Sequence, residues 1–375
     1  MTPDVPAPLT VKKGVCCALY AYDVGLSIDL DACKKQIASW MQNATVRQNR
    51  RAPKYFDYRP APLPVTQSVT PCKIGAHAIS AEVDLLLYDF GGVSVSYEIP
   101  FSGGLDTLRD ISCQLVESDV LLDDSRRRVE ELLKAIQGSV ARPGIADLVE
   151  DYVVFQIDEY DTPVKPQELH TYYCREFAQV LRAETQPLSP QEVADAMACR
   201  ISFAEDDVTL IDWNAAMIFD REAEDVRAVL EFANTELLEM RFLDRQLDDA
   251  LDRSYEVISK RSWLRKLIPG SSGASVRSVS QMQVDGAILF ERVSNAPKLL
   301  GDQYLARVYR LAAQRFHLSE WSTGTLRKLD AIESIYNQMH DRAASWRLEL
   351  LEWIIIILIL LELVLPFLPK SLFPH

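Results

Sequence analysis

Apolar and polar positions alternate in two different ways along this chain, and the change occurs near residue 220. Before it, short apolar runs such as Val15–Tyr22 and Tyr152–Ile157 predict buried strands. The run Val83–Pro100, with Gly91–Gly92 at its centre, predicts a β-hairpin. Amphipathic stretches between these runs fit helices. Residues 1–220 are therefore expected to form an α+β head domain, with an antiparallel sheet and helices on one face.

After residue 220 no strand pattern returns, and apolar residues recur every three or four positions. This spacing predicts an all-helical coiled-coil stalk over residues 221–352, with helices at 221–267, 280–316 and 319–352. The last helix carries an unbroken seam of apolar positions, namely Leu329, Ile332, Tyr336, Met339, Ala343, Trp346, Leu350, Trp353, Ile357, Leu360 and Val364. Because the seam continues into the apolar tail, one continuous helix is expected to meet partner helices along a single face.

The tail, WIIIILILLELVLPFLP over residues 353–369, predicts a C-terminal transmembrane or membrane-embedded helix. The run from Trp353 to Leu368 gives about 24 Å of helix, which is short for a hydrocarbon core of about 30 Å. Glu362 is expected to be protonated or to face other protein. A self-associating tail, an interfacial helix and a small pore all remain open. The residues expected to make membrane or oligomer contacts are Trp353, Ile357, Leu360, Glu362, Val364 and Pro366.

A second group of residues, near the end of the first stalk helix, combines positive charge with apolar side chains. It consists of Lys260, Arg261, Trp263, Arg265 and Lys266. Such a patch suits an anionic membrane surface. Cations at a helix C-terminus also complement the helix dipole, and this second explanation is equally compatible with the pattern.

Composition and charge narrow the possible partners. The chain has 48% hydrophobic and 25% charged residues, as folded proteins do, and a net charge of −14. An acidic surface repels phosphate, so nucleic acid is not expected as a partner. The seven cysteines form no C-x-x-C pair, which predicts small buried thiols in a reducing compartment. With no apolar signal segment at the N-terminus, the bulk of the chain is expected in the cytoplasm, held by a single-pass C-terminal membrane anchor.

The sequence contains neither a glycine-rich phosphate loop nor a pair of histidines at metal-binding spacing. The acidic run Glu205–Asp207 fits a divalent-cation site or a turn. The basic run Arg126–Arg128 fits a phosphate or RNA contact or, because consecutive helical residues point in three directions, a solvated helix face. The sequence therefore predicts no enzyme activity, no catalytic residues, no cofactor and no metal.

One segment near the C-terminus resembles a known family. Leu351–Leu363, read as LEWIIIILILLEL, is similar to the ending of the "required for meiotic nuclear division" family (YagE-type proteins). The helical segments at 299–318 and 326–346 follow the order of that family. The resemblance implies a membrane-associated, oligomer-forming protein without established enzymatic activity. In mitochondrial members it implies support of organellar translation.

Taken together, these patterns predict a non-enzymatic, membrane-anchored oligomeric scaffold. Its head domain would bind an unknown protein partner, its C-terminal helices would join copies of the chain, and its tail would contact membrane lipids. The alternative is a small oligomeric membrane pore or effector with Glu362 inside the helix bundle.

Overall fold

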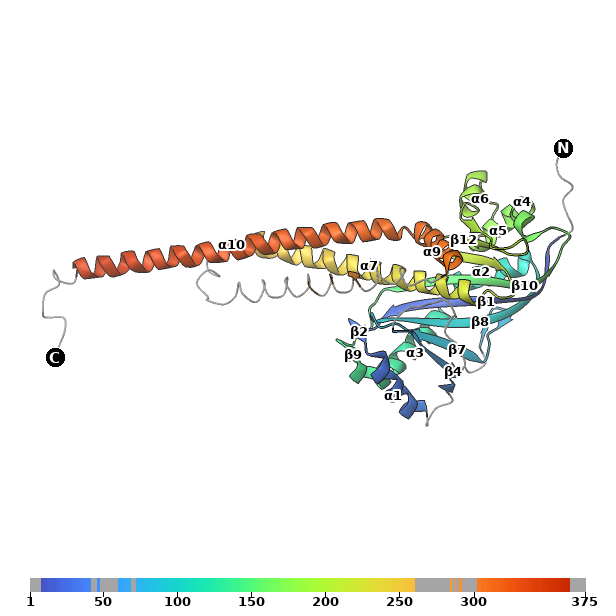
Figure 1. Cartoon of the computed structure of the whole chain (residues 1–375), viewed down its shortest axis with the longest axis horizontal. Coiled ribbons are helices and arrows are strands. Elements are labelled where there is room, and N and C mark those ends of the chain that lie inside the picture. The colour runs from blue at the N-terminus through green and yellow to red at the C-terminus, as the bar shows by residue number, and fades with distance from the viewer. Residues whose placement is uncertain are drawn as a thin grey trace. The chain divides into compact units, whose positions relative to one another are not determined.

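The computed structural model of the chain (Figure 1) describes residues 8–41, 46–47, 60–68, 72–259, 284, 287, 290–291 and 302–364. The chain divides into two compact units. The first contains Met1–Asp244 and Ile288–Thr323, and the second contains Arg245–Ala287 and Gly324–His375. The two units are described separately below.

A nine-stranded sheet forms the centre of the first unit, with strand order β11-β12-β13-β10-β1-β8-β7-β4-β3. The strands, in chain order, are β1 (Thr10–Asp23), β3 (Val46–Arg47), β4 (Leu63–Ser68), β7 (Glu82–Leu87), β8 (Gly92–Gly104), β10 (Val149–Asp161), β11 (Arg200–Ile201), β12 (Val208–Ile211) and β13 (Ala215–Phe219). Two small ribbons pair β2 (Ser27–Ile28) with β9 (Val140–Ala141) and β5 (Lys73–Ile74) with β6 (His77–Ala78).

The sheet is mixed, which corrects the expected antiparallel sheet. Strands β10 and β13 run parallel, with Val153 opposite Ala215, whereas the other neighbouring pairs run antiparallel. A parallel pair needs a long crossover. Here the crossover contains α4 (Pro166–Tyr172), α5 (Cys174–Leu181) and α6 (Pro190–Ala196), followed by β11 and β12.

Strand β1 occupies the middle of the sheet, between β8 and β10. Its residues from Cys16 to Asp23 are buried, because both faces of a central strand are covered. The strand is longer than its apolar run predicts. Its polar start is held by ion pairs to β10, from Lys12 to Asp161 (3.1 Å) and from Lys13 to Asp158 (3.0 Å).

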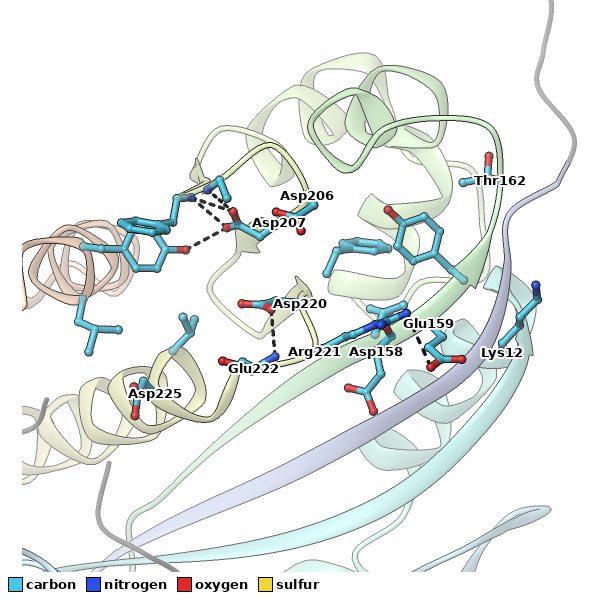
Figure 2. A pocket seen from close by; sticks show the side chains of 18 of the residues that line it. Lys12, Asp158, Glu159, Thr162, Asp206, Asp207, Asp220, Arg221, Glu222 and Asp225 are labelled. Carbon is cyan, nitrogen blue, oxygen red and sulfur yellow. Dashed lines mark hydrogen bonds and ion pairs between the residues drawn. The ribbon is translucent and has the colours of Figure 1, made fainter. Parts of the chain in front are cut away.

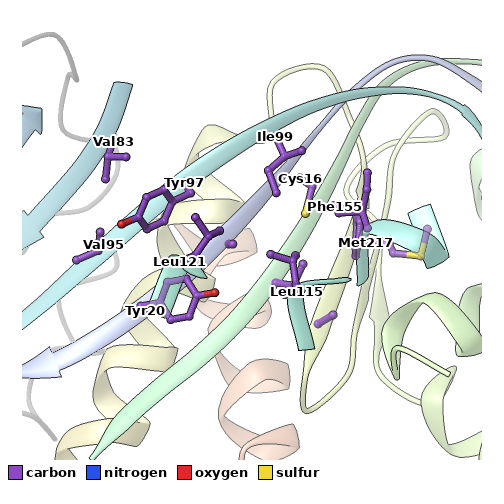
Figure 3. Packing of buried hydrophobic residues seen from close by; sticks show 14 of the residues in the cluster. Cys16, Tyr20, Val83, Val95, Tyr97, Ile99, Leu115, Leu121, Phe155 and Met217 are labelled. Atoms are coloured by element: carbon purple, nitrogen blue, oxygen red, sulfur yellow. The ribbon is translucent and has the colours of Figure 1, made fainter. Parts of the chain in front are cut away.

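One face of the sheet packs against the helices α1 (Leu30–Met41), α2 (Leu105–Glu117), α3 (Val120–Ile136) and α5. A one-turn 3₁₀ helix, η1 (Gln137–Ser139), follows α3. Alternate residues of each strand enter this core. Figure 3 shows the packing of Cys16, Tyr20, Val95, Tyr97, Ile99, Leu115, Leu121, Phe155 and Met217.

The opposite face packs against α7 (Glu224–Ser259) and α9 (Gln303–Arg315). Its apolar contacts join Leu19 and Val154 of the sheet to Leu230 of α7 and Val308 of α9. The side chain of Asp302 caps α9 by accepting hydrogen bonds from the first backbone N–H groups of the helix. The first unit therefore has helices on both faces of its sheet, whereas the sequence predicted them on one.

In the second unit, the structure describes the end of α7 and most of α10 (Leu318–Val364). Lys328 of α10 forms an ion pair with Asp248 of α7 at 2.7 Å. Leu247 and Ala250 of α7 and Ile332 of α10 are buried. The two helices are thus paired over this stretch.

The expected C-terminal membrane helix is not supported. Within the part of the chain that the structure describes, no helix is both long enough and apolar enough to span a bilayer. The run from Trp353 to Leu361 is strongly apolar, but Glu352 and Glu362 lie at its two ends. The fold class, the transmembrane segment and the single-pass anchor predicted from the sequence are therefore corrected.

Candidate functional site: an acidic cleft and a buried polar helix

A cleft of about 950 Å³ opens in the first unit, where several loops meet. It lies between the end of β10, the turn before β12, the turn between β13 and α7, and the start of α9 (Figure 2). Its lining carries the carboxylates of Asp158, Glu159, Asp206, Asp207, Asp220, Glu222, Asp225 and Asp302. Among the described residues that line it, two are cationic, Lys12 and Arg221.

Asp207 is held in this cleft by hydrogen bonds from three residues. It accepts hydrogen bonds from the backbone N–H groups of Phe203 (3.0 Å) and Ala204, and from the Tyr304 hydroxyl (3.4 Å). Burial, and then the nearby charge of Asp207, raises the pKa of Tyr304. Glu205 instead points to Lys165, at 3.6 Å. The acidic run Glu205–Asp207 therefore closes a turn and joins it to α9.

The two cations of the cleft are already paired with acidic groups. Arg221 lies 3.8 Å from the carboxylate of Glu159 and donates a hydrogen bond to the backbone carbonyl of Asp158 (3.3 Å). Lys12 pairs with Asp161. The cleft is therefore net negative, so it attracts cationic groups and repels phosphate. Among the described residues, no group of three or more His, Cys, Asp or Glu side chains is arranged to hold a metal ion.

A network of ion pairs fixes α9 beside the cleft. Asp212, in the turn after β12, is fully buried and accepts hydrogen bonds from Arg182 (3.0 Å) and Arg315 (2.8 Å). Both arginines also reach Asp195 of α6, each at 2.6 Å. Hydrogen bonds from Arg315 and Arg182 lower the pKa of Asp195 to about 2. Every charge in this network has an oppositely charged partner. Since the partners come from different elements, the ion pairs link α5, α6, β12 and α9.

The most unusual environment belongs to α7. Its residues 226–240 are buried all around the helix. Arg227 donates hydrogen bonds to the Cys17 sulfur and to the Glu98 carboxylate, both at 3.1 Å. On β8, Glu98 lies on the same face as Ser94 and Ser96, because strand side chains alternate. This face of the sheet is therefore partly polar where α7 covers it.

A further carboxyl group of α7, Glu236, faces α9. It accepts a hydrogen bond from the Tyr309 hydroxyl at 2.6 Å. Burial raises the pKa of Glu236 to about 8, and the Tyr309 hydrogen bond opposes that rise. Glu236 therefore holds its proton near neutral pH, unlike an exposed glutamate.

The structure does not gather the predicted membrane and oligomer residues into a pocket. Trp353, Ile357 and Leu360 are 64%, 57% and 60% exposed on α10, and Glu362 is also exposed. Val364 ends the helix. The remaining predicted residues lie outside the described part of the chain, namely Pro366, Lys260, Arg261, Trp263, Arg265 and Lys266.

Two other sequence features have structural explanations. All seven cysteines are free, and five of them are buried, as expected for small apolar side chains. Within the basic run, Arg128 is buried and donates hydrogen bonds to Asp124 (2.6 Å) and Gln67 (3.0 Å). The run is therefore not a free phosphate-binding surface.

The sequence reasoning missed the buried polar side chains of α7. A signal was present, because Arg227, Glu231, Thr235 and Glu239 recur every fourth residue and so share one side of a helix. That spacing was obscured by the apolar residues between them. Polar side chains at helical spacing are usually solvated, and only the covering sheet and helices reveal that these are buried.

The profile of a family described as "Uncharacterized protein MJ0711, N-terminal domain" matches residues 13–225. The chain belongs to this family. The match covers the sheet and the start of α7. The resemblance to the "required for meiotic nuclear division" family rested mainly on residues 299–363, and the comparisons do not support it. That assignment was wrong.

A relative with the same description is found in an archaeon. The uncharacterized protein MJ0711 of Methanocaldococcus jannaschii is 22% identical over 241 residues. The alignment covers 63% of this chain and 71% of the relative. No solved structure matches the chain.

Proposed function

We propose that this protein is a non-enzymatic scaffold whose copies assemble through the C-terminal part of α10. The first unit then serves as the part that binds a protein partner. The observation that carries the proposal is a run of nine apolar residues, Trp353–Leu361, with every side chain exposed. Their exposed fractions lie between 43% for Ile354 and 64% for Trp353.

Such a run is unfavourable in water. Each fully buried Leu or Ile side chain stabilises a protein by about 1.5–3 kcal/mol relative to an exposed one. A helix that is apolar on all sides is normally covered by other chains or elements. Large contiguous apolar patches on a soluble surface mark interaction sites. The run is therefore expected to be covered in the working protein.

A second copy of the same chain is the cover that the pattern favours. Trp353, Ile357 and Leu360 continue the three- and four-residue spacing that begins at Leu329. Identical helices with this spacing pack side by side through matching seams. Glu352 precedes the run of nine apolar residues and Glu362 follows it.

The negative charge of the protein limits which classes of partner the first unit is expected to bind. The net charge of −14 and the acidic cleft both repel phosphate groups, so the proposal does not include nucleic acid. The proposal also includes no reaction. Asp212, Asp195, Arg182 and Arg315 are bound to each other, and Glu236 is bound to Tyr309, so these groups join secondary-structure elements.

The proposal is tested by measuring the mass of the full chain in solution. Sedimentation velocity over a range of protein concentrations should show an oligomer for the natural chain. The double substitution Ile357→Lys with Leu360→Lys places two charges in the apolar run. It should shift the protein to monomer, because burying unpaired charges is costly.

Leu326→Lys is the matched control, since Leu326 is exposed at 45% on the same helix but lies outside the apolar run. This variant should keep the mass of the natural chain. A natural chain that stays monomeric at every concentration would contradict the proposal. So would an oligomer that survives the double substitution.

A further inference from the structure

Two carboxyl groups meet inside the first unit, where the last residue of β1 lies against α7. Asp23 is 4% exposed and Glu239 is 1% exposed. Among the described residues, neither forms an ion pair with a lysine or an arginine. Two adjacent ionised carboxylates cannot both stay buried without a cation, because like charges repel strongly in a low-dielectric interior.

The backbone leaves little room between the two elements. Gly92 of β8 is the partner of Asp23 in the sheet. A β-carbon added to Gly92 would lie 2.6 Å from the Thr235 side chain and 3.3 Å from the Glu239 carboxylate. Glycine is therefore needed for this close approach, and α7 packs directly on the strands.

Other charged groups near the pair already have partners or share its sign. Arg227 pairs with Glu98 at the other end of the buried stretch, and Arg241 pairs with Glu150 of β10. Glu231, on the same side of α7, adds another buried acidic group. The local surroundings of Asp23 and Glu239 therefore favour a neutral or singly charged pair.

We propose that Asp23 and Glu239 share a proton and form a pH-sensitive latch that holds α7 on the sheet. With the proton present, one carboxyl group donates a hydrogen bond to the other. When the proton leaves, two buried negative charges face each other across the contact between helix and strand. The contact then weakens and this part of α7 opens more often.

The direction of the pH effect follows from the two carboxyl groups. Burial raises the pKa of Asp23 to about 7. Burial, and then the charge of Asp23, raises the pKa of Glu239. Carboxyl groups of an unfolded chain have pKa values near 4. The latch therefore stabilises the docked helix fully below about pH 4 and loses its effect as the pH rises through about 7.

Hydrogen exchange of the full chain tests the latch directly. Protection of the α7 amides over residues 226–240 should fall by at least about tenfold between about pH 6 and about pH 9, after correction for intrinsic exchange. Amides of α2 report on the other face of the sheet and should change much less. Equal loss in both helices would overturn the proposal, because it would indicate general unfolding.

The substitution Glu239→Gln distinguishes the pH effect of the Asp23–Glu239 pair from the effects of other titrating groups. The glutamine amide donates to Asp23 without a proton to lose, so the pH-dependent loss of protection should shrink markedly. Glu224→Gln is the matched control on the same helix, since it removes an exposed acid at the start of α7 that lies away from the pair. The control should keep most of the loss. A Glu239→Gln variant that keeps the full loss would overturn the latch.

Carbon-13 NMR of the carboxyl groups in the natural chain gives a result that does not depend on a variant folding. Asp23 and Glu239 should titrate together, at pH values well above those of exposed carboxylates. Titration of both at ordinary acidic pH would overturn the proposal. A shift of these signals on adding magnesium or calcium at constant pH would also overturn it, because a cation would then replace the shared proton.

Discussion

Two helical segments of this protein reverse the usual relation between polarity and exposure. In α7, residues 226–240 are buried although they include Arg227, Glu236 and Glu239. In α10, residues 353–361 are apolar and all of them are exposed. The first segment lies in the sheet-containing unit and the second lies in the other unit.

The difference shows that the surroundings of a helix, and not its composition, decide which side chains leave water. Buried polar groups are stabilised by hydrogen-bond partners, and the sheet and α9 supply such partners to Arg227 and Glu236 of α7. No corresponding cover is described around residues 353–361 of α10. Its apolar residues therefore favour the proposed contact with a second copy, whereas the polar residues of α7 form an internal contact.

The largest expected effect comes from shortening matched leucines in the two segments. Leu230→Ala removes a fully buried side chain of α7 and should lower the free energy of unfolding by about 3 kcal/mol. Leu358→Ala, at an exposed position of α10, should change it by less than about 0.5 kcal/mol. Urea denaturation at low protein concentration, followed by circular dichroism, measures both. Equal losses of unfolding free energy in the two variants would contradict the proposed difference between the buried segment of α7 and the exposed segment of α10.

A second test uses the pH dependence of a buried acid in α7. The folded pKa of Glu236 is about 8, above the value near 4 of an unfolded chain. Its contribution to stability is therefore present at low pH and is lost as the pH rises towards 8. Glu236→Gln should stabilise the protein by about 2 kcal/mol at pH 6 relative to its effect at pH 4, since each pH unit above the unfolded pKa removes about 1.4 kcal/mol until the folded pKa is reached. Thermal unfolding at both pH values measures this. A constant difference would show that Glu236 titrates normally.

The smallest expected change in the free energy of unfolding comes from a substitution next to the buried residues 226–240 of α7. Arg241 follows Met240, where the continuous buried stretch of α7 ends, and pairs with Glu150 of β10. Because Arg241 is partly exposed, Arg241→Ala should cost about 1 kcal/mol or less. Arg241→Lys, which keeps the charge, serves as the control. If Arg241→Ala lowered the free energy of unfolding as much as Leu230→Ala does, the continuous buried stretch would have to extend beyond Met240.

Much of the secondary structure could be predicted from the sequence because it depends on local patterns. The apolar alternation around Gly91–Gly92 predicts the hairpin that the structure shows as β7 and β8. The three- and four-residue spacing predicts long helices, observed as Glu224–Ser259 and Leu318–Val364. In both cases neighbouring residues along the chain carry the necessary information.

Long-range packing could not be predicted in the same way. The parallel pairing of β10 with β13 depends on a crossover of several elements, and no local signal specifies it. Helix α9 belongs to the same compact unit as the sheet, on which its apolar residues pack, and Asp212 binds Arg315 far along the chain. The partners of Arg227 and Glu239 likewise come from β1 and β8, so their burial is invisible in the helix sequence alone.

The central position of β1 has a consequence for the newly made chain. This strand leaves the ribosome first of the sheet, yet its two neighbours are residues 92–104 and 149–161. At about 5–20 residues per second, the second neighbour follows on the order of ten seconds later. Until residues 92–104 are made, the apolar run from Val15 to Tyr22 has neither of its neighbours, and until residues 149–161 are made one of its edges stays unpaired. The sheet of the nascent chain therefore closes only after both neighbours of β1 are made. Until then, this unpaired apolar strand can associate with other chains, which is a hazard for folding.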